Sequence, residues 1–228
     1  MKVIRNLDNI DMNVDKGSIA VIGSFDGVHK GHRLLIQKLN ELALQYEIVP
    51  FVITFDIHPL KIIRGSCKLL STLEEKIELL EEAGTRNLVL IPFSEELRNM
   101  VYDKFLSEVL VEKLNVKYIV VGDELHFGFE RGGNEVTIRN FDIETIKIGR
   151  VSDISSTVIR NDVLNGKMEE ANILLGGRGY LIKTPLTDKS KILPPKGKYK
   201  AIQDDGMVKE ISIPESLETI EDKRIRII

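Results

Sequence analysis

Short apolar runs alternate along the chain with stretches in which apolar side chains recur every three or four residues. A near-continuous apolar run is typical of a buried parallel strand, whereas apolar side chains at every third or fourth position are typical of an amphipathic helix. Residues 48–55 form the clearest run, and Leu35, Leu39 and Leu42 form the clearest helical series. The predicted strands cover residues 18–22, 48–55, 88–91 and 118–121.

Capping residues and glycines mark the ends of the predicted helices. Ser71 and Glu74 have the spacing of a capping box, and Gly84 is the expected end of that helix. Asp103 is placed to cap the next helix. Two later helices are predicted over residues 156–165 and 168–175, ended by Gly166 and Gly176.

This repeated order of strands and helices predicts an α/β fold with a mostly parallel sheet and helices on both of its faces. In such sheets, ligands bind beyond the carboxyl ends of the strands. The segments that follow Gly23, Phe55 and Gly122 are therefore the places where a site is expected.

The pattern changes near residue 177, where prolines and glycines begin to interrupt short β-like runs such as 180–182. We therefore predict a main domain over residues 1–178 and a short β-rich tail over residues 179–228. A tail of about fifty residues is too short for an independent core, so we expect it to pack on the main domain.

Composition narrows the classes of partner. The sequence is 43% hydrophobic and 29% charged with a net charge of −3, so no global field favours nucleic acid or an anionic membrane. Any phosphate site must therefore be local. The single cysteine, Cys67, excludes an internal disulfide, and we expect a spare thiol in a reducing compartment. Without a bilayer-length apolar run or a secretory signal in residues 1–15, a cytoplasmic location is expected.

The segment most specific for chemistry is G-S-F-D-G-V-H-K-G-H, residues 23–32, which follows a predicted strand and opens a helix. Its glycines allow sharp turns and close approach to a ligand, and free amides at a helix start favour an anion. His29 and His32 are three residues apart, so both can face one side of the first turn. Two imidazoles there suit a triphosphate attacked at its α-phosphorus, because they would stabilise oxygens that gain charge. A glycine-rich turn with two partly exposed histidines is the structural alternative.

This segment resembles the H-x-G-H motif of the nucleotidyltransferase superfamily. The whole segment, read as G-x-F-D-G-V-H-x-G-H, is similar to the FAD synthetase module of bacterial bifunctional riboflavin kinase/FMN adenylyltransferases. Residues 54–59, T-F-D-I-H-P, look like the T-F-x-P-H-P of that family, with Ile57 in place of the first proline. His58 would then help to hold ATP, although a histidine before a proline is also a common turn residue. For residues 70–80, which follow that loop, we expect only a packing role.

Residues 154–160, I-S-S-T-V-I-R, resemble the I-S-S-T-x-I-R of the same family. Ser155, Ser156 and Thr157 stand at a predicted helix start, where hydroxyls and amides can bind phosphate oxygens. Arg160 lies about one turn further on and offers a fork of donors suited to pyrophosphate. An ordinary Ser/Thr cap with a solvated arginine is the alternative for this segment alone.

The match weakens at residues 120–128, V-V-G-D-E-L-H-F-G, which align with the V-V-G-x-D/N-F-x-F-G of the family. Glu124 stands where the family has Asp or Asn, and Leu125 stands where it has Phe. Because Glu is one methylene longer than Asp, its carboxylate reaches a different point, and the sequence leaves open whether a flavin contact at Glu124 is retained, shifted or lost. Flavin-binding residues implied by the resemblance are Glu124, Phe127 and Arg131; for Arg131 and Asp123, a mobile surface turn is an equal alternative.

The resemblance covers about residues 1–176. The G-F-P-T-A-N string of the riboflavin kinase domain is absent, so riboflavin kinase activity is not expected. Residues 191–199 only echo a kinase-domain segment, and we expect them to have structural value. The further site residues that the resemblance implies are, for catalysis, His29, His32 and Arg160, and, for ATP, Gly23, Ser24, Phe25, Asp26, Gly31, His58, Ser156 and Thr157.

Taken together, the resemblance implies a Rossmann-like nucleotidyltransferase fold and an FMN adenylyltransferase that converts ATP and FMN into FAD and pyrophosphate. It implies Mg²⁺, bound with ATP as a bridge between phosphates. The sequence shows no clustered carboxylates or Cys/His set that would hold a metal without substrate. Two alternatives remain: transfer to another small phosphate acceptor, and a non-catalytic flavin or nucleotide sensor. The expected partners are small molecules, with no nucleic acid and no membrane, and the sequence leaves open whether the chain forms a homo-oligomer.

Overall fold

Six parallel strands form the larger of two sheets in the computed structural model, which describes residues 1–7, 12–64, 67–95, 97, 102–122, 135–149, 154–186, 188–214 and 224–228. Every pair of neighbouring strands in this sheet runs parallel. The order across the sheet is β1, β4, β3, β2, β5 and β6. The strands are β1 (Lys2–Ile4), β2 (Ser18–Ile22), β3 (Val49–Phe55), β4 (Asn87–Ile91), β5 (Val116–Val121) and β6 (Glu144–Lys147). The parallel α/β fold predicted from the apolar runs is confirmed.

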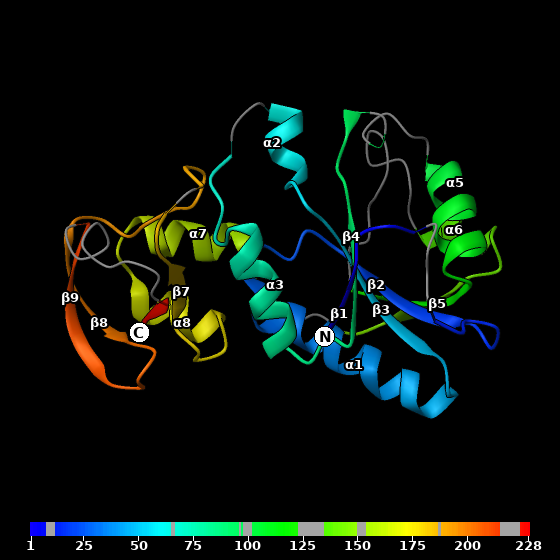
Figure 1. Cartoon of the computed structure of the whole chain (residues 1–228), viewed down its shortest axis with the longest axis horizontal. Helices are drawn as coiled ribbons and strands as arrows, with labels where there is room; N and C mark the ends of the chain where they lie inside the picture. Colours follow the sequence, from blue (N-terminus) through cyan, green and yellow to red (C-terminus); the bar gives the residue numbers. More distant parts are fainter. Residues whose placement is uncertain are drawn as a thin grey trace. The chain divides into compact units, whose positions relative to one another are not determined.

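Strand β2 stands at the point where the strand order reverses. Its successor β3 pairs on one side of it, and β5 pairs on the other (Figure 1). In open α/β sheets such a switch point opens a crevice beyond the carboxyl ends of the two strands, where ligands bind. Gly23 and Ser24 follow β2 directly, and the Gly23 amide donates to the Ile53 carbonyl at 3.1 Å. The first expected site segment therefore leaves the sheet at its switch point.

Helices cover the sheet, and apolar side chains from the strands and the helices pack together as its core. Helix α1 (Lys30–Tyr46) buries Ile36, Leu39 and Leu42, as the helical spacing predicts. A second helical segment, α5 (Tyr102–Lys104) continued by the π-helix η2 (Phe105–Lys113), packs residues such as Leu106 and Leu110 against the strands. Asp103 was expected as its cap; that prediction is wrong, because Tyr102 is already helical and Asp103 lies in the first turn. Shorter helices are α2 (Pro59–Arg64) and α6 (Glu135–Arg139).

Helix α3 (Leu73–Glu82) begins with a capping box that lies one residue later than predicted. The Glu75 amide donates to the Thr72 hydroxyl at 3.2 Å, and the Thr72 amide donates to the Glu75 carboxylate at 2.9 Å. Ser71 does not take this role because its hydroxyl accepts from the Gly27 amide at 3.0 Å. Gly84 follows the helix with a φ of +90°, so the predicted helix end is confirmed.

The chain packs as two compact units, which are described separately. The first unit comprises Met1–Ser24, Arg33–Gly65 and Glu81–Arg150, and it contains the parallel sheet. The second unit comprises Phe25–His32, Ser66–Leu80 and Val151–Ile228. It contains the motif segment together with both later helices, which the predicted boundary at residue 178 had assigned to the main domain. That boundary stays a prediction.

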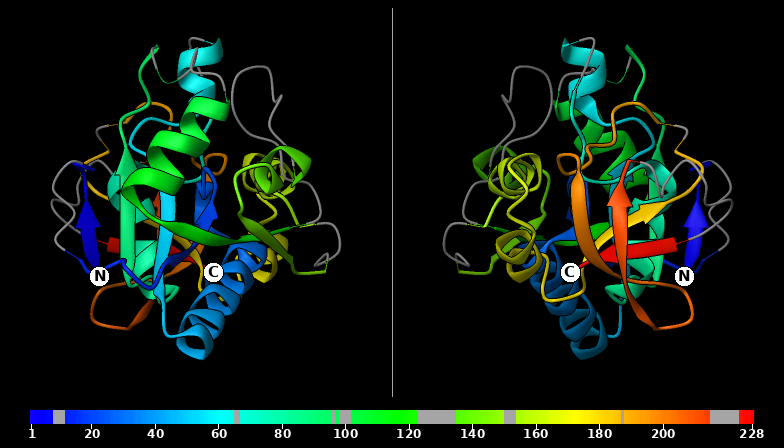
Figure 2. Two further views of the ribbon diagram at one scale, coloured as in Figure 1. Left: turned by 90° about the vertical axis from the view of Figure 1, so that its right-hand side faces the viewer. Right: turned by 90° about the vertical axis from the view of Figure 1, so that its left-hand side faces the viewer.

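The second unit is built around a small antiparallel sheet in the order β7, β10, β8 and β9 (Figure 2). The predicted β-rich tail is therefore confirmed. Its core joins this sheet with helices α7 and α8 and with Leu70 from the segment before α3. These elements are α7 (Ser156–Leu164), α8 (Met168–Leu174), β7 (Tyr180–Lys183), β8 (Gly197–Ile202), β9 (Val208–Ile213) and β10 (Arg224–Ile227). Among the described helices, none combines the length and the apolar character that crossing a lipid bilayer requires.

Candidate functional site

The motif segment of the second unit adopts an unusual backbone. Phe25 has a left-handed conformation with φ of 50°, and a short 3₁₀ turn, η1 (Asp26–Val28), follows it. Val28 has φ of 40°, which is costly for a β-branched residue. Both side chains are almost completely buried. Such strained conformations persist only where the surroundings over-determine them, and they concentrate at functional sites.

Asp26 fixes this backbone from inside the protein. Its carboxylate is 2% exposed, and Oδ1 accepts from the amides of Leu70 at 2.8 Å and Ser71 at 3.0 Å. The Ser71 hydroxyl lies 3.3 Å from the same oxygen. The other carboxylate oxygen, Oδ2, forms an ion pair with the Arg160 guanidinium at 2.9 Å. Asp26 therefore ties together three segments that are distant in the sequence.

The glycines of the motif are required by packing inside the protein. Gly27 has a φ of +74°, and a side chain there would meet Leu70 at 2.9 Å. Gly31 would meet the His29 ring at 3.3 Å. In the structure, the close neighbour of Gly27 is Leu70 and that of Gly31 is His29. The expected approach of a ligand to this turn stays a prediction.

His29 and His32 form a stacked pair. Their ring centroids are 3.7 Å apart and the ring planes are inclined by only 16°. The Phe25 ring packs against His32 at a centroid distance of 5.0 Å. The expectation that the two histidines face one side of the turn agrees with this geometry.

The charge state of His29 follows from its burial. The side chain is 7% exposed, and this desolvation lowers its pKa from 6.5 to about 4, against the opposing effect of the nearby Asp26 charge. A neutral imidazole has one N–H donor and one acceptor nitrogen. At neutral pH, His29 is therefore a hydrogen-bonding group without a positive charge.

Helix α7 supplies a second set of donors. Ser155 caps the helix by accepting from the Val158 amide at 3.3 Å, as a serine in this position is expected to do. The Ser156 hydroxyl donates to the Asp26 carbonyl at 3.0 Å, so it is already engaged within the protein. Thr157 is exposed at the first turn. Arg160 lies one turn on, with an 18% exposed side chain and a buried Nε that has no hydrogen-bond partner among the described residues.

Other predicted ATP residues lie in the first unit. Ser24 accepts through its carbonyl from the Thr54 hydroxyl at 3.4 Å, close after the end of β2. His58 stands before helix α2, where its Nδ1 accepts from the Leu60 amide at 3.2 Å. Asp56, which sequence reasoning did not single out, accepts from the Phe93 amide at 2.8 Å and so joins the loop after β3 to the chain after β4.

The structure thus brings predicted residues of the second unit into two contacting groups: Asp26 with Ser156 and Arg160, and His29 and His32 with Phe25 and Gly31. The predicted flavin residues Glu124, Phe127 and Arg131 lie outside the described residues. Sequence reasoning missed the amides of residues 70 and 71, which bind Asp26, because backbone donors leave no mark on residue type. Leu70 packs in the core as expected, and the segment also supplies the two amides that bind Asp26.

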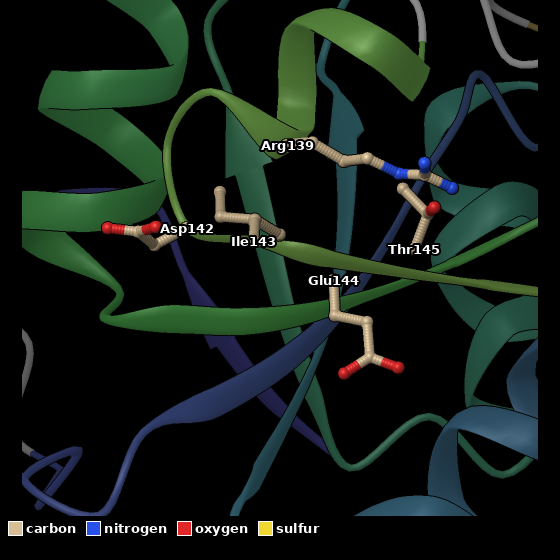
Figure 3. Close-up of a pocket in the computed structure, with 5 residues that line it drawn as sticks. All are labelled: Arg139, Asp142, Ile143, Glu144 and Thr145. Atoms are coloured by element: carbon tan, nitrogen blue, oxygen red, sulfur yellow. The ribbon is translucent and has the colours of Figure 1, made fainter.

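The first unit also contains a depression of about 410 Å³ beside α6 and β6. Figure 3 shows Arg139 and Thr145 close together there, whereas the carboxylates of Asp142 and Glu144 point away from them. It contains none of the predicted site residues. The chemistry of the sequence motifs therefore does not depend on this depression.

Comparison with known proteins identifies the family to which most of the chain is similar. The profile of the FAD synthetase family matches residues 11–161. A bifunctional riboflavin kinase/FMN adenylyltransferase of Buchnera aphidicola subsp. Schizaphis graminum is 32% identical over 187 residues, which cover 77% of this chain and 60% of that protein. The protein of the same name from Escherichia coli K12 is 33% identical over 187 residues, covering 77% of this chain and 59% of that protein. The chain thus spans about 60% of the length of these relatives.

A solved structure supports the fold independently. The crystal structure of a macrolide-efflux protein from Streptococcus pneumoniae superposes with a TM-score of 0.76 at 23% identity, covering 100% of this chain and 83% of that chain. At this identity the likeness concerns the fold alone. The family match, in contrast, covers more than half of the chain and includes both the histidine segment and Arg160. The chain belongs to the FAD synthetase family.

Proposed function

We propose that the protein is an FMN adenylyltransferase, which transfers the AMP group of ATP to FMN and releases pyrophosphate. The observation that carries the proposal is the ion pair of Asp26 with Arg160, which joins the histidine segment to helix α7 within the part of the chain that the family profile matches. Two motifs separated by more than a hundred residues thus converge on one carboxylate.

The reaction is a direct displacement. A phosphate oxygen of FMN forms a bond to the α-phosphorus of ATP, and the bond from that phosphorus to the bridging oxygen of the β-phosphate breaks. The electron pair of that bond leaves with pyrophosphate. The FMN phosphate is ionised near neutral pH, so the step requires no general base and no covalent intermediate. Catalysis then consists of positioning and of stabilising charge on the phosphate oxygens.

Donors from the second unit would meet that charge. His29, neutral at pH 7, and His32 would donate hydrogen bonds to the α-phosphate and to the departing oxygen. Arg160 has five N–H donors, of which the Asp26 pair uses one side of the guanidinium. Its remaining donors, with the exposed first turn of α7, would bind the pyrophosphate group.

Asp26 and Phe25 would take part differently from our first expectation. Both side chains are almost fully buried, and a carboxylate would repel phosphate oxygens. We therefore assign Asp26 to positioning Arg160, and only backbone groups of this turn to ATP. Gly23, Ser24, Gly31, His58, Ser156 and Thr157 remain the proposed ATP neighbours; for Ser156 the amide is the available group, since its hydroxyl is engaged.

Mg²⁺ would reach the site with the ATP phosphates. Within the described part of the chain, no three His, Cys, Asp or Glu side chains cluster as a metal site. The buried Asp26 carboxylate is already saturated by two amides and a guanidinium. When bound with ATP, Mg²⁺ would neutralise charge between the phosphates.

Incubating the protein with Mg²⁺ and a nucleotide, and separating the flavins by chromatography, tests the proposal. We expect FAD from ATP plus FMN, and much slower conversion when CTP replaces ATP. An unchanged FMN pool, together with adenylylation of another phosphate acceptor, would show that the acceptor is wrong. An unchanged FMN pool with measurable flavin binding would show a sensor.

A further inference from the structure

A lysine of the C-terminal tail, Lys191, is buried beside the segment that holds Asp26. Its ammonium group is 1% exposed and forms an ion pair with Glu75 at 2.8 Å. It also donates to the carbonyls of Leu70 at 2.6 Å and Leu181 at 2.7 Å. An ammonium group has three N–H donors, so all of them are used. The Tyr180 ring lies 4.0 Å from the nitrogen.

The backbone reinforces this contact. The Leu69 amide donates to the Ser190 carbonyl at 2.8 Å, and the Ile192 amide donates to the Leu69 carbonyl at 2.9 Å. The tail therefore holds residues 69 and 70 through three hydrogen bonds, one from Lys191 itself and one from each of its two neighbours in the chain. The same short segment then presents the amides of Leu70 and Ser71 to Asp26.

We propose that Lys191 is a positioning residue for the adenylyl-transfer site, acting through the Leu70–Ser71 peptide on Asp26 and thereby on Arg160. The inference rests on the proposed function. Lys191 does not touch substrate in this account. Its ammonium fixes the Leu70 carbonyl, and the Ser71 amide of the same peptide unit fixes Asp26 Oδ1. The family profile ends at residue 161, so this support comes from a segment outside the matched region.

The buried charge of Lys191 indicates a role in orienting neighbouring segments as well as in packing. Burying an ammonium and a carboxylate costs several kcal/mol per ion before they interact, and apolar residues of similar volume often replace such pairs without loss of stability. Glu75 is fixed in turn, because it caps α3 with Thr72 and accepts from the Lys183 amide at 2.9 Å. The pair therefore orients three segments at once: the loop before α3, strand β7 and the part of the tail around Lys191.

The test separates orientation from stability. Lys191→Met alone leaves Glu75 buried without its partner, so we expect a strong loss of stability. The double variant Glu75→Gln/Lys191→Met removes that unpaired charge and should recover most of the thermal stability. It does not restore the hydrogen bond to the Leu70 carbonyl. We therefore expect its kcat for FAD formation to be about tenfold or more below that of the wild type, because small misplacements of catalytic groups are costly.

The KM for ATP should change much less than kcat, since the misplaced groups act mainly on the transition state. Lys198→Ala is the matched control, because Lys198 belongs to the same tail but forms an exposed pair with Glu210. It should leave kcat unchanged. A folded double variant with kcat within about twofold of the wild type would overturn the inference. Absence of FAD formation by the wild type would instead refute the proposed function.

Hydrogen exchange on the wild-type protein tests the same idea without activity and without a variant that must fold. If the tail supports the Asp26 clamp, the amides of Leu69, Leu70 and Ser71 open as one cooperative unit with that of Ile192. We expect the four to show similar protection. Fast exchange at Leu69 and Ile192, with Leu70 and Ser71 still strongly protected, would refute the proposal.

Discussion

Replacing Asp26 by asparagine tests the central contact of the site. Asparagine keeps one oxygen, which can still accept from the amides of Leu70 and Ser71 at 2.8 and 3.0 Å. It removes the negative charge that faces the Arg160 guanidinium at 2.9 Å. The substitution therefore keeps the acceptor for the two amides and deletes both the ion pair and the hydrogen bond from Arg160, because the new amide nitrogen is a donor.

The size of the effect follows from burial. Breaking a buried pair by removing one partner typically costs about 3–5 kcal/mol. The Arg160 side chain is 18% exposed, so water compensates part of the loss, and we expect the free energy of unfolding to fall by roughly 3 kcal/mol. Because Arg160 is then free to move, kcat for FAD formation should fall by about tenfold or more.

Urea denaturation followed by circular dichroism measures the first effect, since the sequence contains no tryptophan for fluorescence. Asp205→Asn is a suitable control, because Asp205 pairs with Lys209 at 3.9 Å on the exposed part of the tail. Its unfolding curve and its kcat should match those of the wild type. An Asp26→Asn protein with wild-type stability and wild-type kcat would refute the positioning role of the pair.

Further predictions concern the histidines, the glycine turn and the tail. His29→Ala and His32→Ala should each lower kcat by on the order of 10²-fold with the fold retained, and near-normal turnover in both would remove them from the mechanism. Because the pKa of folded His29 is about 4, below its ordinary 6.5, the unfolded chain binds the proton first as pH falls. Between pH 7 and 4, the free energy of unfolding of the wild type should therefore fall by roughly 3 kcal/mol more than that of His29→Gln. Parallel plots of stability against pH for the two proteins would contradict a pKa of about 4 for His29. Gly27→Ala should lower the melting temperature by several degrees, because of its positive φ and of Leu70 at 2.9 Å; an unchanged melting temperature would show that the turn relaxes. With riboflavin and ATP, any formation of FMN should be much slower than FAD formation from FMN and ATP. FMN formation at a comparable rate would overturn the expectation drawn from the absent G-F-P-T-A-N string.

The four inner strands of the sheet were predictable because most of their residues are buried, whereas the edge strands β1 and β6 are largely exposed and were not predicted. The runs at residues 48–55 and 118–121 contain almost no polar residues, and they became β3 and β5 within two residues of the predicted bounds. The helix starts were less predictable. Two overlapping Ser/Thr-x-x-Glu spacings occur at residues 71–75, and the choice between them depends on the contact of Ser71 with Gly27.

The residue types of the site were readable, but their partners were not. Nothing in the local sequence of Asp26 indicates Arg160, because the two residues lie 134 positions apart. Nor does local sequence reveal that Lys191 would reach Leu70, 121 positions away. Such contacts depend on the tertiary arrangement, whereas the positive φ of Gly27 and the Ser155 cap are features of the local backbone.

Isotope transfer from labelled ATP tests adenylyl transfer to FMN most directly. The protein is incubated with FMN and Mg²⁺, once with ATP labelled at the α-phosphorus and once with ATP labelled at the γ-phosphorus, and flavins and pyrophosphate are separated. We expect the α-label in FAD and the γ-label in pyrophosphate. A γ-label in the flavin fraction, or an α-label that never enters a flavin, would contradict it.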